Sequence, residues 1–406
     1  FMVFIVIRFN YNLRDRHPDF NIDLVIDPPS EPGRLSVGFA KMPITPQITD
    51  TWNDFNGNAK YEPDQGETYN DVNGNNKFDP VWIAGFHNRR PAQGVHDELW
   101  ARVMVIDDGA TRVAIASIDA VGFIYDDAVD IRKTAHDKIN CDFTIISSTH
   151  VHQGPDLIGI WGDGFFKSGV NTDHMHHVKR QTVAAIETAV KNLVPAKLWV
   201  GQDLEGAIPY VVDSRDPQEM DPGIRIIQAI EIGSGKTLGS LVSWSNHPET
   251  LWSKNLLISS DFPHYFRESV ENGVHKGDRL LAQGLGGITV FVNGAVGGLM
   301  TTNPSHPIPD PFDGEMHKGA TFEKAQAQGQ QLGLLALKAI RSADVIEIEQ
   351  VGIKIRAKTI SIPLDNWNFL LGFLLGVIDH GTTGWLDVKT EVAALRIGPI
   401  SIITIP

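Results

Sequence analysis

The sequence predicts an α/β fold. Short apolar segments typical of buried strands alternate along most of the chain with longer segments that have the period of an amphipathic helix. Several predicted strands end in aspartate or histidine, side chains that often form sites at the strand ends of α/β sheets. The chain has 406 residues, of which 42% are hydrophobic and 21% charged, so it forms one large globular domain or two ordinary ones.

Strands are predicted wherever apolar or β-branched residues follow one another or alternate with polar residues. They cover residues 36–40, 99–106, 112–118, 143–146, 197–202, 224–232, 238–245, 286–292, 351–362, 391–396 and 400–405. The segments 224–232 and 238–245 are joined by a glycine-rich turn and predict a hairpin. Asp119 follows the strand at 112–118 and is expected either in a site or as a helix cap.

Helices are predicted from four longer segments between the strands. They cover residues 127–138, 173–193, 262–272 and 322–340. The segment 367–378, WNFLLGFLLGVI, is strongly apolar but shorter than the ~20 residues that cross a bilayer. It is expected to be a buried helix; the alternative is a hydrophobic lip for a lipid-like substrate.

Residues 1–34 are expected to lie outside the folded domain. Residues 1–7 are strongly apolar but too short to span a membrane. They are interpreted as the remnant of a signal peptide or membrane anchor, or as a first strand. The remnant is favoured because residues 10–32 have the composition of an extended, proline-rich linker. On this interpretation the protein is extracytoplasmic and its N-terminus lies near a membrane.

Charge and cysteine content exclude several classes of function. Lys+Arg 35 against Asp+Glu 49 gives a net charge of −14, which is unsuited to nucleic acid and to simple electrostatic docking on anionic lipid. Cys141 is the only cysteine, so an internal disulfide and a cysteine-based zinc site are both excluded. A small-molecule or lipid partner is expected, and a homo-oligomer remains open.

Three histidines stand at predicted strand ends. His150 and His152 follow the strand at 143–146, and His247 follows the strand at 238–245. If the first strand continues through them, His150 and His152 point to the same face. Neutral imidazoles on one face suit a zinc ion; the alternative is a pair of partly exposed loop histidines. His174 and His177 are one helical turn apart and are expected on a solvated face; the alternative is a metal-binding pair.

A repeated asparagine-rich segment lies at residues 54–80. Each copy places oxygen-bearing side chains at relative positions 1, 3, 5 and 9 and a lysine carbonyl at position 7, close to the ligand order of an EF-hand-type loop. The glycine falls at position 4 instead of position 6, and the glutamate at position 12 is missing. The predicted calcium ligands are Asp54, Asn56, Asn58, Lys60, Glu62, Asp71, Asn73, Asn75, Lys77 and Asp79. The alternative is a pair of Asx-rich turns without an ion.

Five motifs in a fixed order identify a resemblance. They are VGFAKMPITP at 37–46, LWAR at 99–102, STHVHQGP at 148–155, His247-Pro248, and LRIG at 395–398. In this order they resemble the N-terminal catalytic domain of the neutral/alkaline, non-lysosomal ceramidases, over residues 35–406. The resemblance implies a layered α/β domain with a mixed sheet and helices packed outside it.

The resemblance also implies a mechanism and roles for individual residues. The family uses a zinc ion to activate water for amide hydrolysis. By carry-over, His150 and His247 are zinc ligands, His152 handles the proton, and Arg215 contacts the polar head of the substrate. The expected activity is hydrolysis of an amide or ester bond in a lipid-like or N-acyl compound.

Three departures from the family pattern keep a second class of function open. Gly298 stands where the family has a serine at the reaction centre, and residues 54–80 are an insertion. In the family a Gly-Glu, whose glutamate is a zinc ligand, follows the position of Pro406, and a tyrosine ligand comes further on; this chain stops at Pro406, so either it was cleaved or truncated there or the metal site is incomplete. The alternative function is therefore a non-catalytic structural or assembly protein stabilised by calcium.

Overall fold

The fold is built on a nine-stranded mixed sheet. The computed structural model describes residues 2–296, 299–384 and 386–406. Along the sheet the strands are β16 (Ile288–Asn293), β12 (Thr237–Trp244), β11 (Ile224–Glu231), β9 (Val194–Asp203), β2 (Ser36–Pro43), β6 (Trp100–Asp107), β7 (Arg112–Ile118) and β8 (Phe143–Ser148), and β20 (Ile346–Ile348) also pairs with β9. The pairs β12–β16 and β7–β8, at the two edges, are parallel, and the other neighbours are antiparallel.

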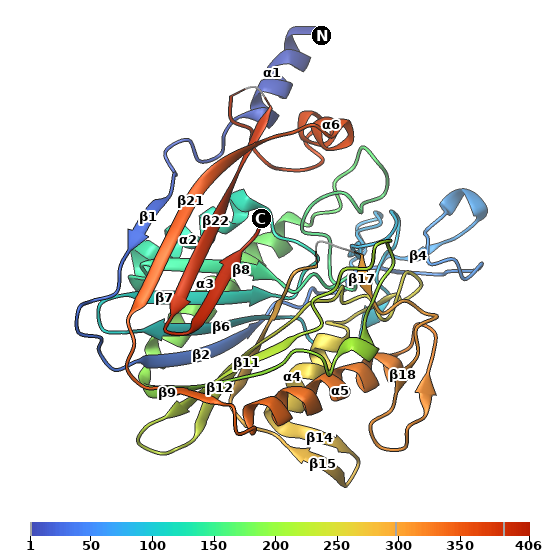
Figure 1. Cartoon of the computed structure of the whole chain (residues 1–406). Helices are drawn as coiled ribbons and strands as arrows, with labels where there is room; N and C mark the ends of the chain where they lie inside the picture. The colour runs from blue at the N-terminus through green and yellow to red at the C-terminus, as the bar shows by residue number, and fades with distance from the viewer. Residues whose placement is uncertain (1, 297–298, 385) are drawn as a thin grey trace.

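A four-stranded antiparallel sheet covers one face of the large sheet (Figure 1). Its strands are β1 (Asp23–Ile26), β21 (Ile353–Pro363), β22 (Asp387–Ile397) and β23 (Ile400–Thr404). The alternating apolar residues of β21 and β22, such as Ile355 and Leu395, pack with Met104 and Ile227 of the large sheet in one buried cluster. This period of two explains why the sequence pattern predicted both strands correctly.

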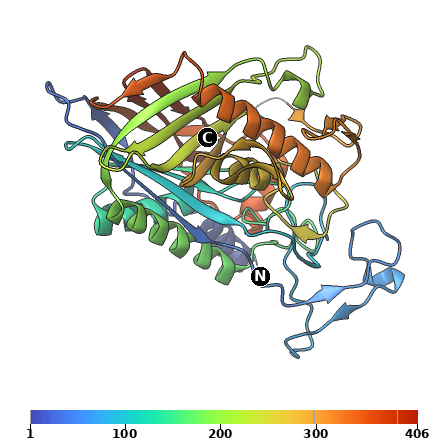
Figure 2. The ribbon, with the colours of Figure 1, turned by 90° about the horizontal axis from the view of Figure 1, so that it is seen from below.

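Four helices cover the opposite face. They are α2 (Tyr125–Ile139), α3 (Thr172–Lys191), α4 (Phe262–Asn272) and α5 (Phe322–Ile340). Successive residues of a strand point to opposite faces of the sheet. Val105, next to Met104, therefore packs in the cluster under α2 and α3, and Ile226, next to Ile227, packs in the cluster under α4 and α5. Figure 2 shows α3 and α5 running along the outside of the sheet. The predicted α/β fold with outer helices is therefore confirmed.

Some elements were not predicted from the sequence. These are the hairpin of β14 (Gly273–Lys276) and β15 (Arg279–Gln283), and short pairs formed by β3 (Thr51–Trp52) with β4 (Tyr69–Asn70), β5 (Gly94–Val95) with β13 (Leu257–Ile258), β10 (Val212–Asp213) with β17 (Met300–Thr301), and β18 (Ile308–Pro309) with β19 (Met316–His317). A strand of two residues is too short to display a period, so no sequence pattern indicates it.

The N-terminal segment differs from the expectation. Residues 2–13 form helix α1 (Met2–Leu13), so the first-strand interpretation is wrong. Residues 10–32 are not simply a linker, because β1 pairs with β21 from Asp23↔Lys358 to Ile26↔Ile355. The end of α1 is attached to the domain through Asn12, whose Nδ2 donates to the Leu374 carbonyl at 2.8 Å. Among the residues that the structure describes, no helix has the length and apolar character needed to cross a bilayer.

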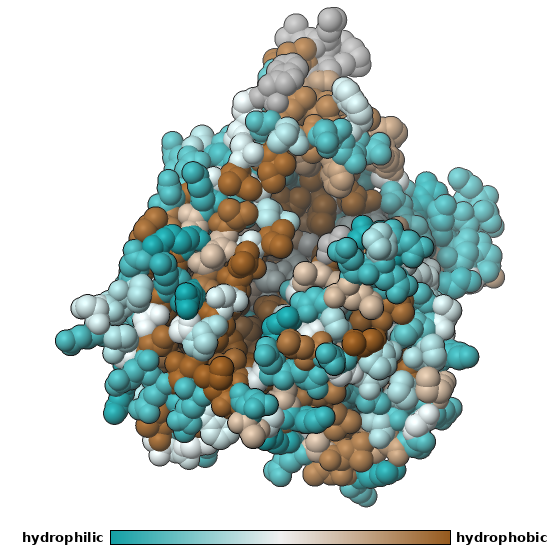
Figure 3. Space-filling view, viewed as in Figure 1, coloured by the Kyte–Doolittle hydropathy of each residue, from teal (hydrophilic) through white to brown (hydrophobic). Residues whose placement is uncertain are grey.

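The apolar segment after β21 forms the short helix α6 (Trp367–Leu375). Leu370 and Phe373 are buried, but Trp367 is 76% exposed and Leu371 is 42% exposed. The helix prediction is confirmed, whereas the expectation that it is buried holds for one face only. α6 lies next to α1 at one end of the molecule, where Figure 3 shows a concentration of apolar surface.

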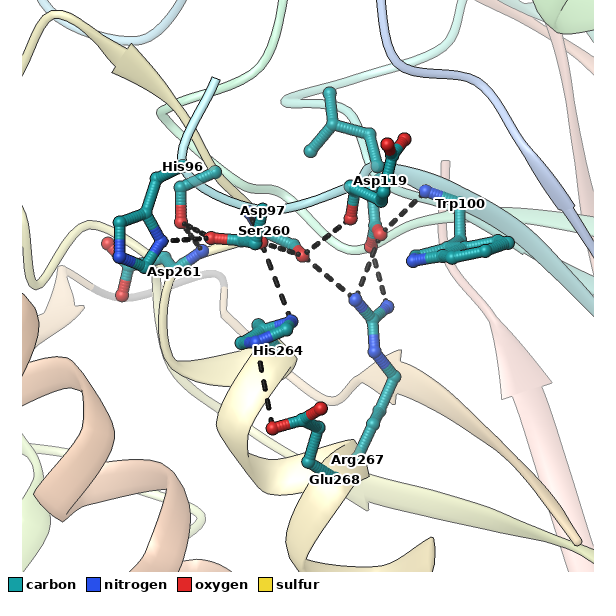
Figure 4. Close-up of polar contacts among 12 residues, drawn as sticks. His96, Asp97, Trp100, Asp119, Ser260, Asp261, His264, Arg267 and Glu268 are labelled. Atoms are coloured by element: carbon teal, nitrogen blue, oxygen red, sulfur yellow. Dashed lines mark hydrogen bonds and ion pairs between the residues drawn. The ribbon is translucent and has the colours of Figure 1, made fainter. Parts of the chain in front are cut away.

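A buried ion pair ties α4 to the residue that follows β7 of the large sheet (Figure 4). Both oxygens of Asp119 accept from the Arg267 guanidinium, at 2.8 and 3.0 Å, and Oδ2 also accepts from Trp100 N at 2.9 Å. Arg267 Nη2 donates in addition to Ser260 Oγ at 2.9 Å. Asp119, expected in a site or as a helix cap, is instead the buried partner of an arginine.

Candidate metal centre

The two parallel edges of the large sheet bring the three strand-end histidines together. β8 ends at Ser148, so the strand does not continue through His150 and His152, and alternation along a strand does not explain their convergence. The chain turns instead at His150, whose φ of 66° lies in the left-handed region. Such a conformation costs a non-glycine residue ~1–2 kcal/mol, so the surrounding contacts must hold it.

Asn293, the last residue of β16, provides one of these contacts. Its Nδ2 donates to the Thr149 carbonyl at 3.0 Å and to the Asn246 carbonyl at 2.7 Å. One amide group therefore connects the residue before His150 with the residue before His247. A backbone bond from His152 N to the Pro248 carbonyl, at 3.0 Å, connects the same two segments again.

The three imidazoles form one cluster. One ring nitrogen from each of His150, His152 and His247 can be chosen so that the three lie within 4.8 Å of one another. The ring centroids are 4.9 Å apart for His150 and His152, 4.7 Å for His150 and His247, and 5.7 Å for His152 and His247. Histidines from two distant parts of the sequence therefore converge, as the zinc prediction required.

The hydrogen-bond partners of His150 and His247 determine which ring nitrogen is available to bind a metal ion. The Nδ1 of His150 lies 2.5 Å from the Val121 carbonyl, and the Nδ1 of His247 lies 2.7 Å from the Met300 carbonyl. A carbonyl only accepts, so both Nδ1 atoms carry the proton and both Nε2 atoms keep a lone pair. Burial lowers the pKa of both histidines, which keeps them neutral and able to bind a metal ion.

His152 is the most deeply buried of the three. Burial lowers its pKa well below 6.5. Among the described residues neither ring nitrogen meets a partner in good hydrogen-bond geometry, although the Gly85 backbone lies close to the ring. Gly85, at φ 107°, lies against it: a Cβ on Gly85 would lie 2.6 Å from the His152 Cβ. A buried imidazole without a hydrogen bond is costly unless something else binds it. The cluster therefore fits a metal ion such as zinc.

Glu249 is a site residue that the sequence analysis did not identify. Its Oε2 lies 3.2 Å from His152 Nδ1, and its Oε1 accepts from Thr301 Oγ1 at 2.5 Å. Burial raises the pKa of this carboxyl group. The only available signal was its position two residues after His247, which does not distinguish it from a surface glutamate.

A cavity of about 610 Å³ opens beside the histidines. It is lined by His152, Ser214, His247, Glu249, Trp252, Leu299, Thr301, Asn303, Pro304 and Ser305. This volume suits a small organic ligand, and the wall combines apolar side chains with a few polar groups, as ligand pockets usually do.

Arg215, the residue predicted to contact the substrate head group, is adjacent in sequence to this cavity's lining. Arg215 follows the lining residue Ser214; its side chain is 52% exposed and its Nε lies 3.8 Å from Asp213 Oδ1. Its contact with a substrate head group therefore stays a prediction. Gly298, which stands at the position of the family's serine, lies outside the described residues.

The two predicted calcium loops fold alike. In each, the position-1 aspartate accepts from the backbone N–H groups of positions 5 and 6, and the position-5 asparagine accepts from that of position 7. Position 6, Ala59 or Asn76, is left-handed with φ near 60°, which gives the sharp bend that glycine provides at position 6 of an EF-hand. The aromatic residues at position 8 of the two loops, Tyr61 and Phe78, contact each other with ring centroids 4.5 Å apart.

His174 and His177 are less exposed than expected for a solvated helix face. Burial lowers the pKa of His174 to about 4, and its Nε2 has no partner among the described residues. Both histidines line a second cavity of about 390 Å³, next to Asp156 and Trp82. They are distinct from the cluster of three histidines, which takes no residue from α3.

The fold and the cluster define a layered α/β protein with a candidate metal centre at its strand ends. Comparison with solved structures finds a neutral ceramidase from Pseudomonas aeruginosa, with a TM-score of 0.62 and 17% identity over 92% of this chain. It also finds a ceramidase complexed with C2, with a TM-score of 0.61 and 16% identity over 91% of this chain. The expected ceramidase fold is therefore confirmed.

The likeness to these two structures establishes the fold and not the activity. The chain spans 62% and 63% of the lengths of the two ceramidase chains. A comparison of the sequence with protein-family models finds no match. Function therefore depends on the site itself, because one fold supports many activities.

Proposed function

We propose that this chain is the catalytic domain of a zinc-dependent hydrolase that cleaves an amide or ester bond in a lipid-like or N-acyl substrate. The observation that carries the proposal is the cluster of three imidazoles, one buried and two half-buried, beside a cavity of about 610 Å³. Two of these imidazoles present Nε2 because a backbone carbonyl holds Nδ1. The likeness to the ceramidase fold points to the same chemistry.

His150 and His247 would hold the ion through Nε2. When bound there, zinc polarises a carbonyl oxygen and lowers the pKa of a water molecule. The chain itself contributes the two carbonyls of Val121 and Met300, which orient the ligands, and a cavity beside them that can hold a substrate. His152 is near enough to act either as a further ligand or as the group that moves the proton.

The substrate class is proposed from the wall of the cavity. Trp252, Leu299 and Pro304 offer apolar surface for an acyl chain, and Ser214 and Asn303 offer hydrogen bonds for a polar head. Arg215 follows Ser214 and is proposed to meet the head group. The exposed side of α6, including Trp367, would serve as an apolar lip during contact with a lipid surface.

Metal analysis combined with an activity panel tests this proposal. Purified protein is expected to retain about one zinc per chain, since catalytic sites of this kind hold a single ion. It is expected to hydrolyse at least one of a panel of N-acyl sphingoid bases, N-acyl amino acids and fatty acyl esters, and to lose that activity in chelator. Protein that takes up calcium but no added zinc, and cleaves nothing in the panel, would instead favour the structural protein stabilised by calcium.

Calcium binding by the loops at 54–80 is a second part of the proposal. We expect the double substitution Asp54→Ala and Asp71→Ala to lower the melting temperature by several degrees in millimolar calcium and to have little effect in chelator. The reason is that ion binding stabilises a loop with few apolar residues of its own. Thermal unfolding of both proteins in both buffers is the measurement. Equal losses in the two buffers would show that calcium does not stabilise these loops.

We propose the location of the protein, like its substrate class, from its exposed apolar surface. A lipid-like substrate and an apolar end of the molecule formed by α1 and α6 fit an extracytoplasmic protein that works near a membrane. Binding to neutral vesicles that is reduced by Trp367→Ala would support this placement.

A further inference from the structure

Trp252 has an unfavourable backbone conformation in the wall of the cavity. Its φ of 55° lies in the left-handed region, which a large side chain rarely adopts. The residue is half-buried and lines the cavity, as Leu299 and Pro304 do. Such conformations persist only where the surrounding structure imposes them, and they concentrate at binding and catalytic sites. The conformation of Trp252 therefore points to a role for its side chain in the cavity.

Three hydrogen bonds hold the backbone of Trp252. Its N–H donates to the Glu249 carbonyl at 2.9 Å. Its carbonyl accepts from Gln153 Nε2 at 2.9 Å and from Arg90 Nη1 at 3.4 Å. Gln153 is fully buried and follows His152 in the chain, so these bonds attach Trp252 to the segment that carries the histidine.

Arg90 is a buried cation without an acidic partner. Its side chain is fully buried, and no described carboxylate forms an ion pair with it. Burial lowers its pKa to about 9, so the guanidinium keeps its charge at neutral pH. Besides the bond to Trp252, its Nη2 donates to the His152 carbonyl at 2.5 Å and to the Ala84 carbonyl. A buried charge is costly, so a guanidinium bound only to three carbonyls around the cavity indicates that it holds this wall in place.

Phe86 connects Trp252 with the histidine cluster. Its ring centroid lies 5.2 Å from that of Trp252 and 5.2 Å from that of His152. The Arg90 guanidinium lies over the same ring, 5.1 Å from its centroid. The indole is thus the outer member of an aromatic series that begins at the candidate metal centre. An acyl chain whose carbonyl lies at that centre would pass along this series.

We propose that Trp252 is the residue that determines affinity for the acyl chain of the substrate, and that Arg90 is the positioning residue that holds it in its left-handed conformation. The inference rests on the proposed function for the class of substrate and assigns to two residues of this chain the recognition of its apolar part. Because folding already orders the indole, a ligand that packs on it loses less conformational entropy on binding.

Binding of octanoate and decanoate tests the assignment without catalysis, since neither acid contains an amide or ester bond. Their dissociation constants are measured by calorimetry on the full chain and its variants. Trp252→Ala is expected to weaken binding of both acids by ~10-fold, because apolar contact area is lost. Trp252→Phe keeps an aromatic ring and is expected to restore part of the affinity. The matched control is Trp199→Ala, which removes a half-buried indole outside the cavity lining and should leave both constants unchanged.

Glycine variants separate the backbone strain from the loss of the indole. Glycine adopts positive φ freely, so Trp252→Gly is expected to unfold at a higher urea concentration than Trp252→Ala, although both bind the acids weakly. The order should reverse at Trp199 in strand β9, where glycine is less favourable than alanine.

A double-mutant cycle tests the role of Arg90. Arg90→Met is expected to weaken binding of both acids and to cause little further loss when combined with Trp252→Ala, because both changes remove the same contact. Gln153→Leu, which removes the other side-chain donor to the Trp252 carbonyl, takes its place if Arg90→Met does not fold.

The outcomes separate this inference from the proposed function. If wild type binds the acids and Trp252→Ala binds them equally well, or if Trp252→Gly is no more stable than Trp252→Ala, the assignment of Trp252 is overturned and the proposed function stands. Losses that add fully in the double mutant would overturn the positioning role of Arg90. If wild type binds neither acid, the proposed class of substrate fails, and this assignment fails with it.

Discussion

His150→Ala is expected to abolish stoichiometric zinc binding and to reduce hydrolysis by ~10³-fold or more, because a bound ion supplies several kcal/mol of transition-state stabilisation. His150 contributes a ligand atom to the cluster, and its φ of 66° shows that the backbone adopts an unfavourable conformation to place it there. Zinc content by mass spectrometry and initial rates on the best substrate of the panel are the two measurements.

The control for this variant is His176→Ala. His176 is exposed on α3 and does not belong to the histidine cluster, so its loss should change neither zinc content nor rate. A His150→Ala protein that retains one zinc per chain and the wild-type rate would exclude the cluster as the catalytic centre.

The second large effect concerns stability. Asp119→Ala is expected to lower the free energy of unfolding by ~3–5 kcal/mol, because it leaves a buried charge without its partner. The side chain of Asp119 is fully buried, that of Arg267 is 2% exposed, and the two form a bidentate pair at 2.8 and 3.0 Å. Equilibrium unfolding in urea, analysed by linear extrapolation, measures the change.

Two further variants separate the cost of an unpaired charge from loss of packing. Asp119→Leu with Arg267→Met replaces the pair by apolar residues and should recover much of the lost stability. Glu187→Ala removes an exposed partner of Lys191, at 2.7 Å, and should change stability little. If Asp119→Ala is no more destabilising than Glu187→Ala, the pair does not hold α4 to the sheet.

The fold was largely predictable because its elements are long and periodic. The bounds of α4 and α5 coincide with the predicted helices, and the alternating residues of β21 and β22 show a clear period of two. The N-terminal helix α1 was not predicted, since an apolar run of seven residues is compatible with strand, anchor or helix. β1 was missed because its four residues stand in a segment with the composition of a linker.

The candidate site was predictable only in part. Histidines at the ends of two predicted strands indicated a metal site, and the structure brings His150, His152 and His247 together. The reason given for the first two was wrong, since β8 ends before them and a left-handed turn at His150 creates the convergence. Such a turn depends on contacts with β16 and with the segment after β12, which a linear pattern does not contain.

Glu249 and Asn293 show even more clearly why the sequence alone could not predict the whole site. Asn293 Nδ2 donates to the carbonyls of Thr149 and Asn246, which lie far apart in the sequence. Glu249 faces a histidine that follows a strand at the opposite edge of the sheet. Both roles arise because the parallel edges β7–β8 and β12–β16 meet, and this closure is a property of the folded sheet.

The central claim is that His150 and His247 hold a catalytic zinc ion within the cluster of three histidines, and zinc-edge anomalous diffraction from crystals of the full chain tests it most directly. We expect one anomalous peak at the cluster, about 2.0–2.1 Å from the Nε2 atoms of His150 and His247. Density with no anomalous peak at the cluster in zinc-soaked crystals, or a peak elsewhere on the molecule, would contradict it.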